Sequence, residues 1–370
     1  MKTLLIIPFL LFSFYSKAQS FSFRHNGILR DYILYVPSVY NANNSVALVF
    51  NLHGYTSNAS QQQTYTMFNQ VADTANFILC YPNGIQNSWN AGNIFASNED
   101  DIGFISALID TISRSYNINL QKVYSTGMSN GGFMSYHLAC HLGNRIAAIA
   151  SVTGSMTPKH SLDCLNALET PIMQIHGTAD PTVPYNGDVW TLSMDSVLSY
   201  WKIHNNCIDT LKVRNLPNTN TLDGTTTTTY RYNNCNFNTE VILYKVINGT
   251  HTWPGAIINT GTTSYDFSAS GEIWNFFNRH TLHPQASSIN TNLINHFDLN
   301  IFPNPASKIL HIDTKKNIDK ISIYNLFGQE VYYNKKGNIK LINIDFLATG
   351  TYFIEIISNN SIIKKKFTKN

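Results

Sequence analysis

Short apolar runs alternate with longer helix-like segments through most of the chain, and this alternation restricts the fold more than any other feature. The run Val46–Leu52 is almost wholly apolar and stops at His53-Gly54, which is typical of a strand buried on both faces of a parallel sheet. The pattern therefore predicts an α/β fold in which helices cover both faces of a mainly parallel sheet. Further strands are expected at residues 77–81, 123–126, 146–152, 172–175 and 241–246, and helices at 61–74, Asp101–Ser115, after Ser129, Met194–His204 and 270–279.

Two other segments have strand-like composition. Residues 21–37 contain two extended runs around Asn26-Gly27, which is the signature of a β-hairpin. Residues 225–229 are five consecutive threonines, and β-branched residues of this kind suit an exposed β-ribbon better than a helix.

Chain length and a change in composition near residue 284 indicate two domains. The chain has 370 residues, more than the usual ~100–200 of one domain, and 43% of them are hydrophobic. Residues 284–298 are polar and rich in Ser and Asn, as linkers are. Short β-rich runs follow, as in a small all-β sandwich. We expect a large α/β domain at residues 19–283 and a β-sandwich at residues 299–370.

Residues 1–18 have the layout of a secretory signal peptide. Lys2 supplies a positive start, residues 4–14 a short apolar stretch, and Ser16 and Ala18 the small side chains of a cleavage site. No later run approaches the ~18 consecutive apolar residues of a membrane helix, so no span is expected in the mature protein. We expect a secreted protein, extracellular or at the cell surface.

The charge of the chain is low. Only 13% of the residues are charged and the formal net charge is +3, which gives no broad field that would attract nucleic acid. Small neutral or polymeric substrates fit this composition better.

The five cysteines fit an exported protein in which disulfides persist. Their spacing is not that of a metal site. We expect the disulfides Cys207–Cys235 and Cys140–Cys164, with Cys80 left buried in an apolar strand.

The motif Gly127-Met128-Ser129-Asn130-Gly131 stands where an expected strand gives way to an expected helix. A serine on such a sharp turn is held in a strained conformation with its hydroxyl exposed, and flanking glycines remove side chains that would clash. The alternative is a tight turn without a chemical role. In this context we interpret Ser129 as the nucleophile of a serine hydrolase.

A serine nucleophile needs a histidine to accept its proton and a carboxylate to orient that histidine, and the fold places them in the order serine, acid, histidine. Asp180 follows the expected strand at 172–175, at the sheet edge where α/β proteins build their sites. His251 lies just after another core strand, in a loop of small and rigid residues. Asp180 as a turn cap and His251 as a surface histidine are the structural alternatives. The later histidines fit less well, because they end helices or lie in the linker or the small domain: His204, His280, His283, His296 and His311.

Two backbone N–H groups are expected to stabilise the oxyanion of the tetrahedral intermediate. One belongs to Asn130, directly after the nucleophile, and the other to Tyr55, in the loop after an early strand. His53 and His176 are expected to order their loops rather than to act in the chemistry.

Two aromatic residues are candidates for binding substrate. Trp253 lies close to His251 and Trp89 lies in another loop, and either indole can line a groove for aromatic, sugar or polymer substrates. Burial in the core is the structural alternative for both.

The acidic run Glu99-Asp100-Asp101 can bind a cation, since hard cations prefer carboxylates. It also stands just before an expected helix, where acids favour the N-terminal end of the dipole, and we prefer this interpretation.

Taken together, these motifs resemble those of the polyhydroxybutyrate depolymerase and feruloyl/acetylxylan esterase family. The resemblance covers roughly residues 21–282 and implies an α/β-hydrolase fold with Ser129, Asp180 and His251 as its triad. Tyr55 departs from it, since many relatives have a small residue or cysteine there. The motifs are Leu52-His53-Gly54, Tyr81-Pro82-Asn83-Gly84, Trp89-Asn90-Ala91-Gly92, Asp100-Asp101-Ile102-Gly103-Phe104, Gly127-Met128-Ser129-Asn130-Gly131-Gly132, His176-Gly177-Thr178-Ala179-Asp180 and His251-Thr252-Trp253-Pro254-Gly255.

The end of the chain is similar to the C-terminal sorting domain of the bacterial type IX secretion system. This resemblance implies an interaction with that machinery and passage across the outer membrane, with cleavage of the tail left open. A carbohydrate-binding module is the alternative, but residues 299–370 contain no tryptophan for stacking on sugars. The resemblance rests on Ile301-Phe302-Pro303-Asn304-Pro305, Ile321-Ser322-Ile323-Tyr324-Asn325-Leu326-Phe327-Gly328-Gln329, Gly350-Thr351-Tyr352 and the Lys-rich end.

We therefore expect a secreted esterase that needs no metal or organic cofactor and acts on feruloyl or acetyl esters of plant cell-wall polysaccharides. A polyhydroxybutyrate-type polyester depolymerase is the alternative substrate class. A non-catalytic polysaccharide-binding relative and a peptidase on the same scaffold are further alternatives.

Overall fold

The computed structural model describes residues 17–92, 97–159, 164, 167–258, 260–282, 299–314, 317–325, 329–335, 339–358 and 361–370. Most of the predicted signal peptide and all of the predicted linker at 284–298 lie outside these residues. Lys17 and Ala18, the last two residues of the predicted signal, begin the first strand, where they pair with Val36 and Tyr35.

A mixed sheet forms the centre of the larger unit. In the part of the chain that is described it has ten strands, in the order β1-β2-β4-β3-β5-β6-β7-β10-β9-β8. The six strands from β4 to β10 run parallel, and the strands outside this block pair antiparallel. The strands are β1 Lys17–His25, β2 Ile28–Val36, β3 Val46–Leu52, β4 Ile78–Pro82, β5 Ile118–Met128, β6 Ala148–Val152, β7 Ile172–Gly177, β8 Lys212–Asn215, β9 Thr226–Tyr232 and β10 Val241–Ile247.

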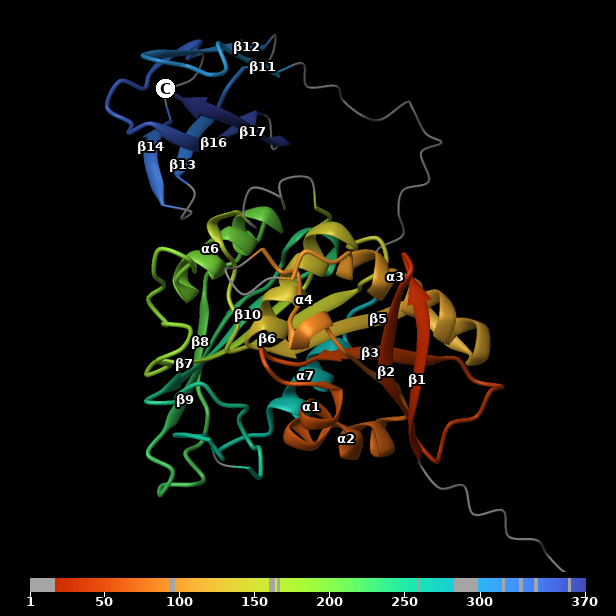
Figure 1. The fold of residues 1–370 in the computed structure, drawn as a ribbon. Helices are drawn as coiled ribbons and strands as arrows, with labels where there is room; N and C mark the ends of the chain where they lie inside the picture. The colour runs from red at the N-terminus through yellow and green to blue at the C-terminus, as the bar shows by residue number, and fades with distance from the viewer. Residues whose placement is uncertain are drawn as a thin grey trace, which may run out of the picture.

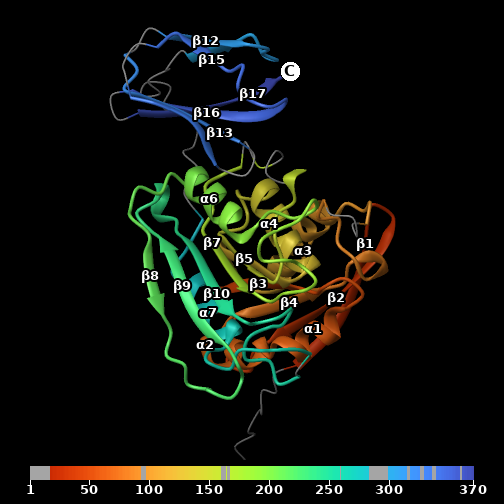
Figure 2. The ribbon, with the colours of Figure 1, turned by 90° about the vertical axis from the view of Figure 1, so that its left-hand side faces the viewer.

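Helices cover both faces of this sheet (Figures 1 and 2). One hydrophobic core lies between the sheet and α3, α4 and α6, and a second lies between the sheet and α1, α2 and α7. Every residue of β3 and β6 is buried, which explains why the central strands are almost continuously apolar. The predicted α/β-hydrolase fold is thereby confirmed. The helices are α1 Ala59–Thr66, α2 Phe68–Ala75, α3 Asp101–Ser115, α4 Asn130–His141, α6 Met194–His204 and α7 Ala269–Phe277.

The helix expected at residues 61–74 is two helices, which is a correction. Met67 separates α1 from α2 with left-handed φ and ψ of 53° and 24°. The break lets the two segments face different surroundings, because α2 buries Phe68 and Ala72 in the core while α1 is mostly polar and has no apolar stripe. The run of threonines is a strand as expected, but it belongs to β9 of the main sheet, with Thr227 buried.

The C-terminal residues form two antiparallel sheets around a core of their own. One sheet has the order β11-β12-β15 and the other β14-β13-β16-β17. Alternate residues of β16 are buried, including Ile354 and Ile356, as expected for strands with one face on a core. The predicted small all-β sandwich is confirmed, and β11 adds a strand that was not expected. The strands are β11 Leu299–Phe302, β12 Ile309–Thr314, β13 Lys320–Asn325, β14 Glu330–Asn334, β15 Leu341–Asn343, β16 Gly350–Ser358 and β17 Ser361–Lys369.

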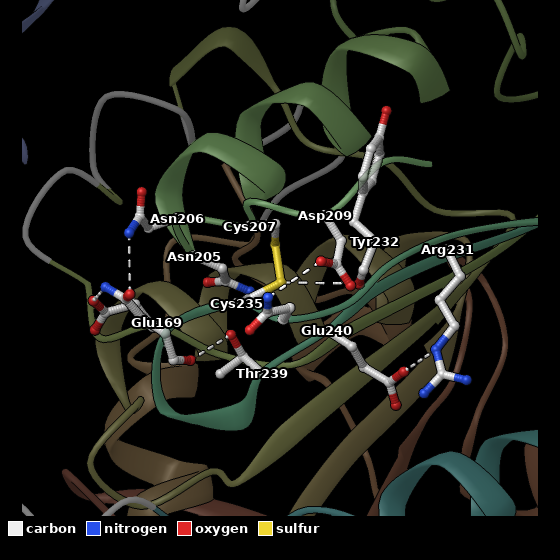
Figure 3. Close-up of a disulfide and its surroundings, with 12 residues drawn as sticks. Glu169, Asn205, Asn206, Cys207, Asp209, Arg231, Tyr232, Cys235, Thr239 and Glu240 are labelled. Carbon is white, nitrogen blue, oxygen red and sulfur yellow. Dashed lines mark hydrogen bonds and ion pairs between the residues drawn. A yellow bond between two sulfur atoms is a disulfide. The ribbon is translucent and has the colours of Figure 1, made fainter. Parts of the chain in front are cut away.

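Both predicted disulfides are present. Cys140 at the end of α4 is bonded to Cys164, and Cys207 after α6 is bonded to Cys235 before β10 (Figure 3). Cys80 is a buried free thiol in β4, and burial raises its pKa. The odd cysteine is therefore part of the core, as expected.

Candidate active site

Ser129 occupies the turn between β5 and α4 in a strained backbone conformation. Its φ of 53° and ψ of −120° lie outside the regions that serine normally adopts. The N–H of Ser129 donates to the carbonyl oxygen of Val152 at the end of β6, at 2.9 Å, and this bond holds the turn against the neighbouring strand. The serine therefore lies at the carboxyl edge of the parallel strands.

Glycines on both sides allow this turn to pack closely. A Cβ on Gly131 would lie 2.2 Å from the carbonyl oxygen of Leu52, at the end of β3, and a Cβ on Gly127 would lie 2.6 Å from the backbone of Gly131. Atoms do not approach so closely, so a larger residue at either position displaces the turn.

Asp180 follows β7 and His251 follows β10, and the two residues meet at the carboxyl ends of these adjacent parallel strands. Nδ1 of His251 is 2.8 Å from Oδ2 of Asp180. The side chain of Asp180 is fully buried, whereas that of His251 is 18% exposed. Because a buried carboxylate accepts hydrogen bonds, this contact places the proton of a neutral imidazole on Nδ1 and leaves Nε2 as an acceptor.

The loops that carry Asp180 and His251 are held together by their backbones. A Cβ on Gly177 would lie only 2.1 Å from the carbonyl oxygen of Gly249, so glycine is required for the two loops to touch. The N–H of Ala179 donates to the carbonyl oxygen of Gly249 at 2.9 Å. Residues that are about 70 positions apart in the chain are thereby fixed next to each other.

The surroundings of Asp180 favour its charged form. Oδ1 accepts the N–H groups of Thr182 and Val183 at 2.8 and 2.9 Å. Oδ2 lies 3.4 Å from Nε2 of His176, in addition to its bond with His251. Burial by itself would raise the pKa of Asp180, but the hydrogen bond from His251 and the other donors outweigh it and lower the pKa below its ordinary value.

His176 orders the loop that carries Asp180. The side-chain amide of Gln174 donates to its Nδ1 at 2.9 Å, so its Nε2 carries the proton and donates to the carbonyl oxygen of Val183 at 2.8 Å. The ring is completely buried, and burial lowers its pKa. A neutral histidine in this place agrees with the loop-ordering role that was expected.

The loop that contains Tyr55 runs beside Ser129. A Cβ on Gly54 would lie 3.5 Å from the Cβ of Ser129, in ordinary van der Waals contact. His53 fixes this loop, because its Nδ1 donates to the carbonyl oxygen of Gly54 at 2.7 Å and its Nε2 accepts the N–H of Gly84 at 2.9 Å. Burial lowers the pKa of His53 to about 4, so it is neutral near pH 7.

Trp89 and Trp253 are both buried, which corrects the expectation that they contact substrate from the wall of a groove. The indole N–H of Trp89 donates to the carbonyl oxygen of His53 at 2.9 Å, and its backbone N–H donates to the side chain of Asn130 at 2.7 Å. The indole of Trp253 donates to the hydroxyl of Ser270 at 3.2 Å. Trp89 thus connects the loop at His53 to Asn130, the residue that follows Ser129.

Ser129 and His251 line one cavity of about 780 Å³, which Tyr55 also borders. Polar side chains of α1 line one part of the cavity, and the larger side chains Tyr65, near the end of α1, and Ile258 also line it. Sequence reasoning did not find these residues. A signal was present, because α1 lacks the apolar stripe of a helix that only packs on a core. The α1 wall consists of Ser60, Gln61, Gln62 and Thr64, with Ser57 just before the helix.

The acidic run before α3 serves the structure. Asp100 caps the helix by accepting the N–H of Gly103 at 2.8 Å. Asp101 is buried and pairs with Arg30 at 2.6 Å. Within the described part of the chain, no group of three or more His, Cys, Asp or Glu side chains is arranged to hold a metal ion. None of the described helices has the length and apolar character that a bilayer crossing requires.

The strand order and the serine turn define an α/β-hydrolase domain, and family models match both parts of the chain. Residues 38–194 match the model described as phospholipase/carboxylesterase, and residues 300–370 match the secretion system C-terminal sorting domain. The predicted resemblances to carboxylic ester hydrolases and to a sorting domain are therefore confirmed. The sorting domain supports the predicted extracellular or cell-surface location.

Curated relatives are esterases. A probable feruloyl esterase C of Aspergillus niger is 30% identical over 43% of this chain and 58% of its own length. A bifunctional acetylxylan esterase/xylanase of Neocallimastix patriciarum is 31% identical over 44% of this chain and 23% of its own length. The chain therefore spans only part of these relatives. The solved acetyl xylan esterase from Aspergillus awamori superimposes with a TM-score of 0.49 at 14% identity, over 70% of this chain and 99% of that chain.

Proposed function

We propose that the protein is an exported serine esterase that hydrolyses feruloyl or acetyl esters of plant cell-wall polysaccharides. The hydrogen bond between Asp180 and His251, at a cavity that Ser129 also lines, is the observation that carries this proposal. The likeness to feruloyl and acetylxylan esterases supports the substrate class. Activity and substrate are inferences for this chain, because it spans only part of those relatives.

In the proposed reaction, the hydroxyl oxygen of Ser129 attacks the ester carbonyl while Nε2 of His251 accepts the hydroxyl proton. Asp180 holds the imidazole in the required tautomer and stabilises its positive charge. The N–H groups of Asn130 and Tyr55 donate to the oxyanion. His251 then gives its proton to the leaving alcohol, and water, deprotonated by the same histidine, hydrolyses the acyl-enzyme.

The position of the cavity agrees with this chemistry. Asn130 is the first residue of α4, so its N–H points out of the helix at the positive end of the dipole, next to Ser129. The cavity falls in the size range that holds a small-molecule ligand, with room for an acyl group and part of an attached sugar. Its α1 wall offers amides and hydroxyls without charge, which suits a neutral saccharide.

The first test is Ser129→Ala. We expect it to lower kcat on 4-nitrophenyl acetate by about 10⁶-fold, and to prevent labelling by a fluorophosphonate probe. A thermal melt of the variant should show a folded protein. Undiminished turnover in a folded Ser129→Ala protein would reject the mechanism. Wild-type protein that neither turns over nor takes the label would instead identify a non-catalytic relative.

Substrate class is tested with wild-type protein on methyl ferulate, acetylated xylan and polyhydroxybutyrate film, alongside an amide analogue of the ester. We expect release of acid from one or both cell-wall esters. Release from the film alone would replace the proposal with a polyester depolymerase. Faster cleavage of the amide than of its matched ester would identify a peptidase.

We further propose that residues 19–283 form the hydrolase domain and that residues 299–370 engage the type IX secretion machinery. The separate hydrophobic core of the C-terminal residues supports this division. We expect a chain that ends at residue 283 to accumulate inside cells of a host with this machinery, while the full chain reaches the medium or the cell surface. Equal export of both chains would contradict the proposed role of the tail.

A further inference from the structure

The loop between β7 and α6 carries two consecutive apolar side chains that face solvent. Val189 is 80% exposed and Trp190 is 54% exposed. The buried side chains of Tyr185 and Leu192 flank them. Neighbouring apolar groups that are kept out of the core in this way mark a binding surface more often than an isolated one does. We call Val189 and Trp190 the 189–190 platform.

Hydrogen bonds within the turn fix the position of the platform. Oδ1 of Asp188 accepts the N–H groups of Trp190 and Thr191, both at 2.8 Å, and the hydroxyl of Thr191 at 3.0 Å. The N–H of Asp188 donates back to the carbonyl oxygen of Thr191 at 3.0 Å. Because the turn is already ordered, binding of a ligand to Trp190 costs little conformational entropy of the loop.

The platform belongs to the sheet edge that carries the candidate active site. The loop that follows β7 carries Asp180 and then Thr182, and Thr182 lines the cavity. It is anchored at its other end by Leu192, whose N–H donates to the carbonyl oxygen of Met156 at 2.8 Å. Met156 follows β6, on the same carboxyl edge of the sheet as Ser129. The loops that carry the cavity residues and the platform therefore share the carboxyl edge of the sheet.

We propose that the 189–190 platform is an accessory site that binds a polysaccharide chain next to the active site. The inference rests on the proposed function for the kind of polymer. The indole offers a flat apolar face to the C–H groups of a sugar ring. The exposed amide of Asn186 and carboxylate of Asp188 stand beside it and can bond to sugar hydroxyls. A polyester has no hydroxyls along its chain, so it can donate no hydrogen bond to these side chains.

The consequence for function is a higher local concentration of substrate. When a polysaccharide chain is bound at the platform, its ester groups reach the cavity within the same complex, so their effective concentration at the active site rises. Small soluble esters do not reach both places, so they gain nothing from the platform. The accessory site therefore affects polymeric substrates only.

The test measures binding of the full chain to insoluble xylan that carries no esters, so that its result does not depend on hydrolysis. We expect Trp190→Ala to weaken binding about five- to tenfold, and Val189→Ser to weaken it less. The kcat/KM on 4-nitrophenyl acetate should stay at the wild-type value in both variants. Phe237→Ala is the matched control, because Phe237 is 60% exposed but precedes β10, at the opposite edge of the sheet.

Unchanged xylan binding by a folded Trp190→Ala protein would overturn the accessory site. An equal loss in Phe237→Ala would do the same, because it would show a general effect of surface aromatics. Weaker binding of Trp190→Ala to polyhydroxybutyrate film but not to xylan would assign the platform to a polyester instead. Loss of xylan binding in a protein without esterase activity would support the platform while rejecting the proposed function.

Discussion

A buried carboxylate pairs with a histidine at each end of β10, and the two pairs differ in every respect that matters for chemistry. At the carboxyl end Asp180 bonds to His251, which is partly exposed at a cavity. At the amino end Glu240 bonds to His280 at 2.8 Å, and both side chains are buried. The comparison shows that a carboxylate and a histidine at 2.8 Å do not make a site. Of the two rings, that of His251 lines the cavity that Ser129 also lines.

Two arginines pair with the carboxylate of Glu240. Arg279 and Arg231 pair with its two oxygens at 2.7 and 2.5 Å, and Figure 3 shows Arg231 reaching the carboxylate. Burial by itself would raise the pKa of Glu240, but His280 and Arg279 outweigh it and lower the pKa to about 2. Among the described residues, the partners of Asp180 are imidazoles and backbone N–H groups. The contacts of Glu240 stabilise the amino end of β10, whereas those of Asp180 orient the proposed base His251.

The largest expected effect is on activity and separates the two carboxylates. We expect Asp180→Asn to lower kcat by about 10⁴-fold, because an amide no longer fixes the tautomer of His251 or stabilises its charged form. The matched change Glu240→Gln should leave kcat unchanged. Steady-state hydrolysis of 4-nitrophenyl acetate measures both. If Glu240→Gln lowers kcat as much as Asp180→Asn does, the distinction between the pairs is lost.

The second effect is on the free energy of unfolding, and here Glu240→Gln is the variant that is expected to change. The shift of the pKa of Glu240 from 4.5 to about 2 corresponds to roughly 3 kcal/mol. We expect Glu240→Gln to lower the free energy of unfolding by at most about 3 kcal/mol, because both arginines remain partly solvated. Urea unfolding of the two variants at pH 7 measures this, and Asp180→Asn serves as the comparison.

The same pair predicts a pH dependence. The folded pKa of Glu240 lies below the unfolded value, so its stabilisation is complete above about pH 4.5 and is lost as the pH falls toward 2. Wild-type protein should therefore lose stability faster than Glu240→Gln over this window. Parallel stability curves for the two proteins would show that Glu240 does not supply this term.

Local sequence was sufficient for the elements that depend on neighbours in the chain. The strained turn at Ser129 was predicted from flanking glycines and the change from strand to helix, and the buried strands from their continuous apolar character. The break at Met67 was missed, because each half of that segment is compatible with a helix and only the different surroundings of α1 and α2 require two.

Long-range packing decided the rest. Trp89 and Trp253 were predicted to line a groove for substrate, yet both indoles are buried and donate to inner polar groups. Trp190 carried no functional prediction, and its side chain is exposed. Sequence cannot separate these cases, because an indole suits a core and a surface equally well and its place depends on which loops meet.

The sequence by itself determined the order of strands and helices along the chain, the serine turn and the two-part organisation, because spacing and local composition specify each of them. Sequence order already paired Asp180 with His251, but tertiary structure alone decided that Glu240 reaches His280 and two arginines. It also decided that α1 forms a wall of the cavity. These contacts join residues far apart in the chain, and only the closure of the parallel strands brings them within hydrogen-bonding distance.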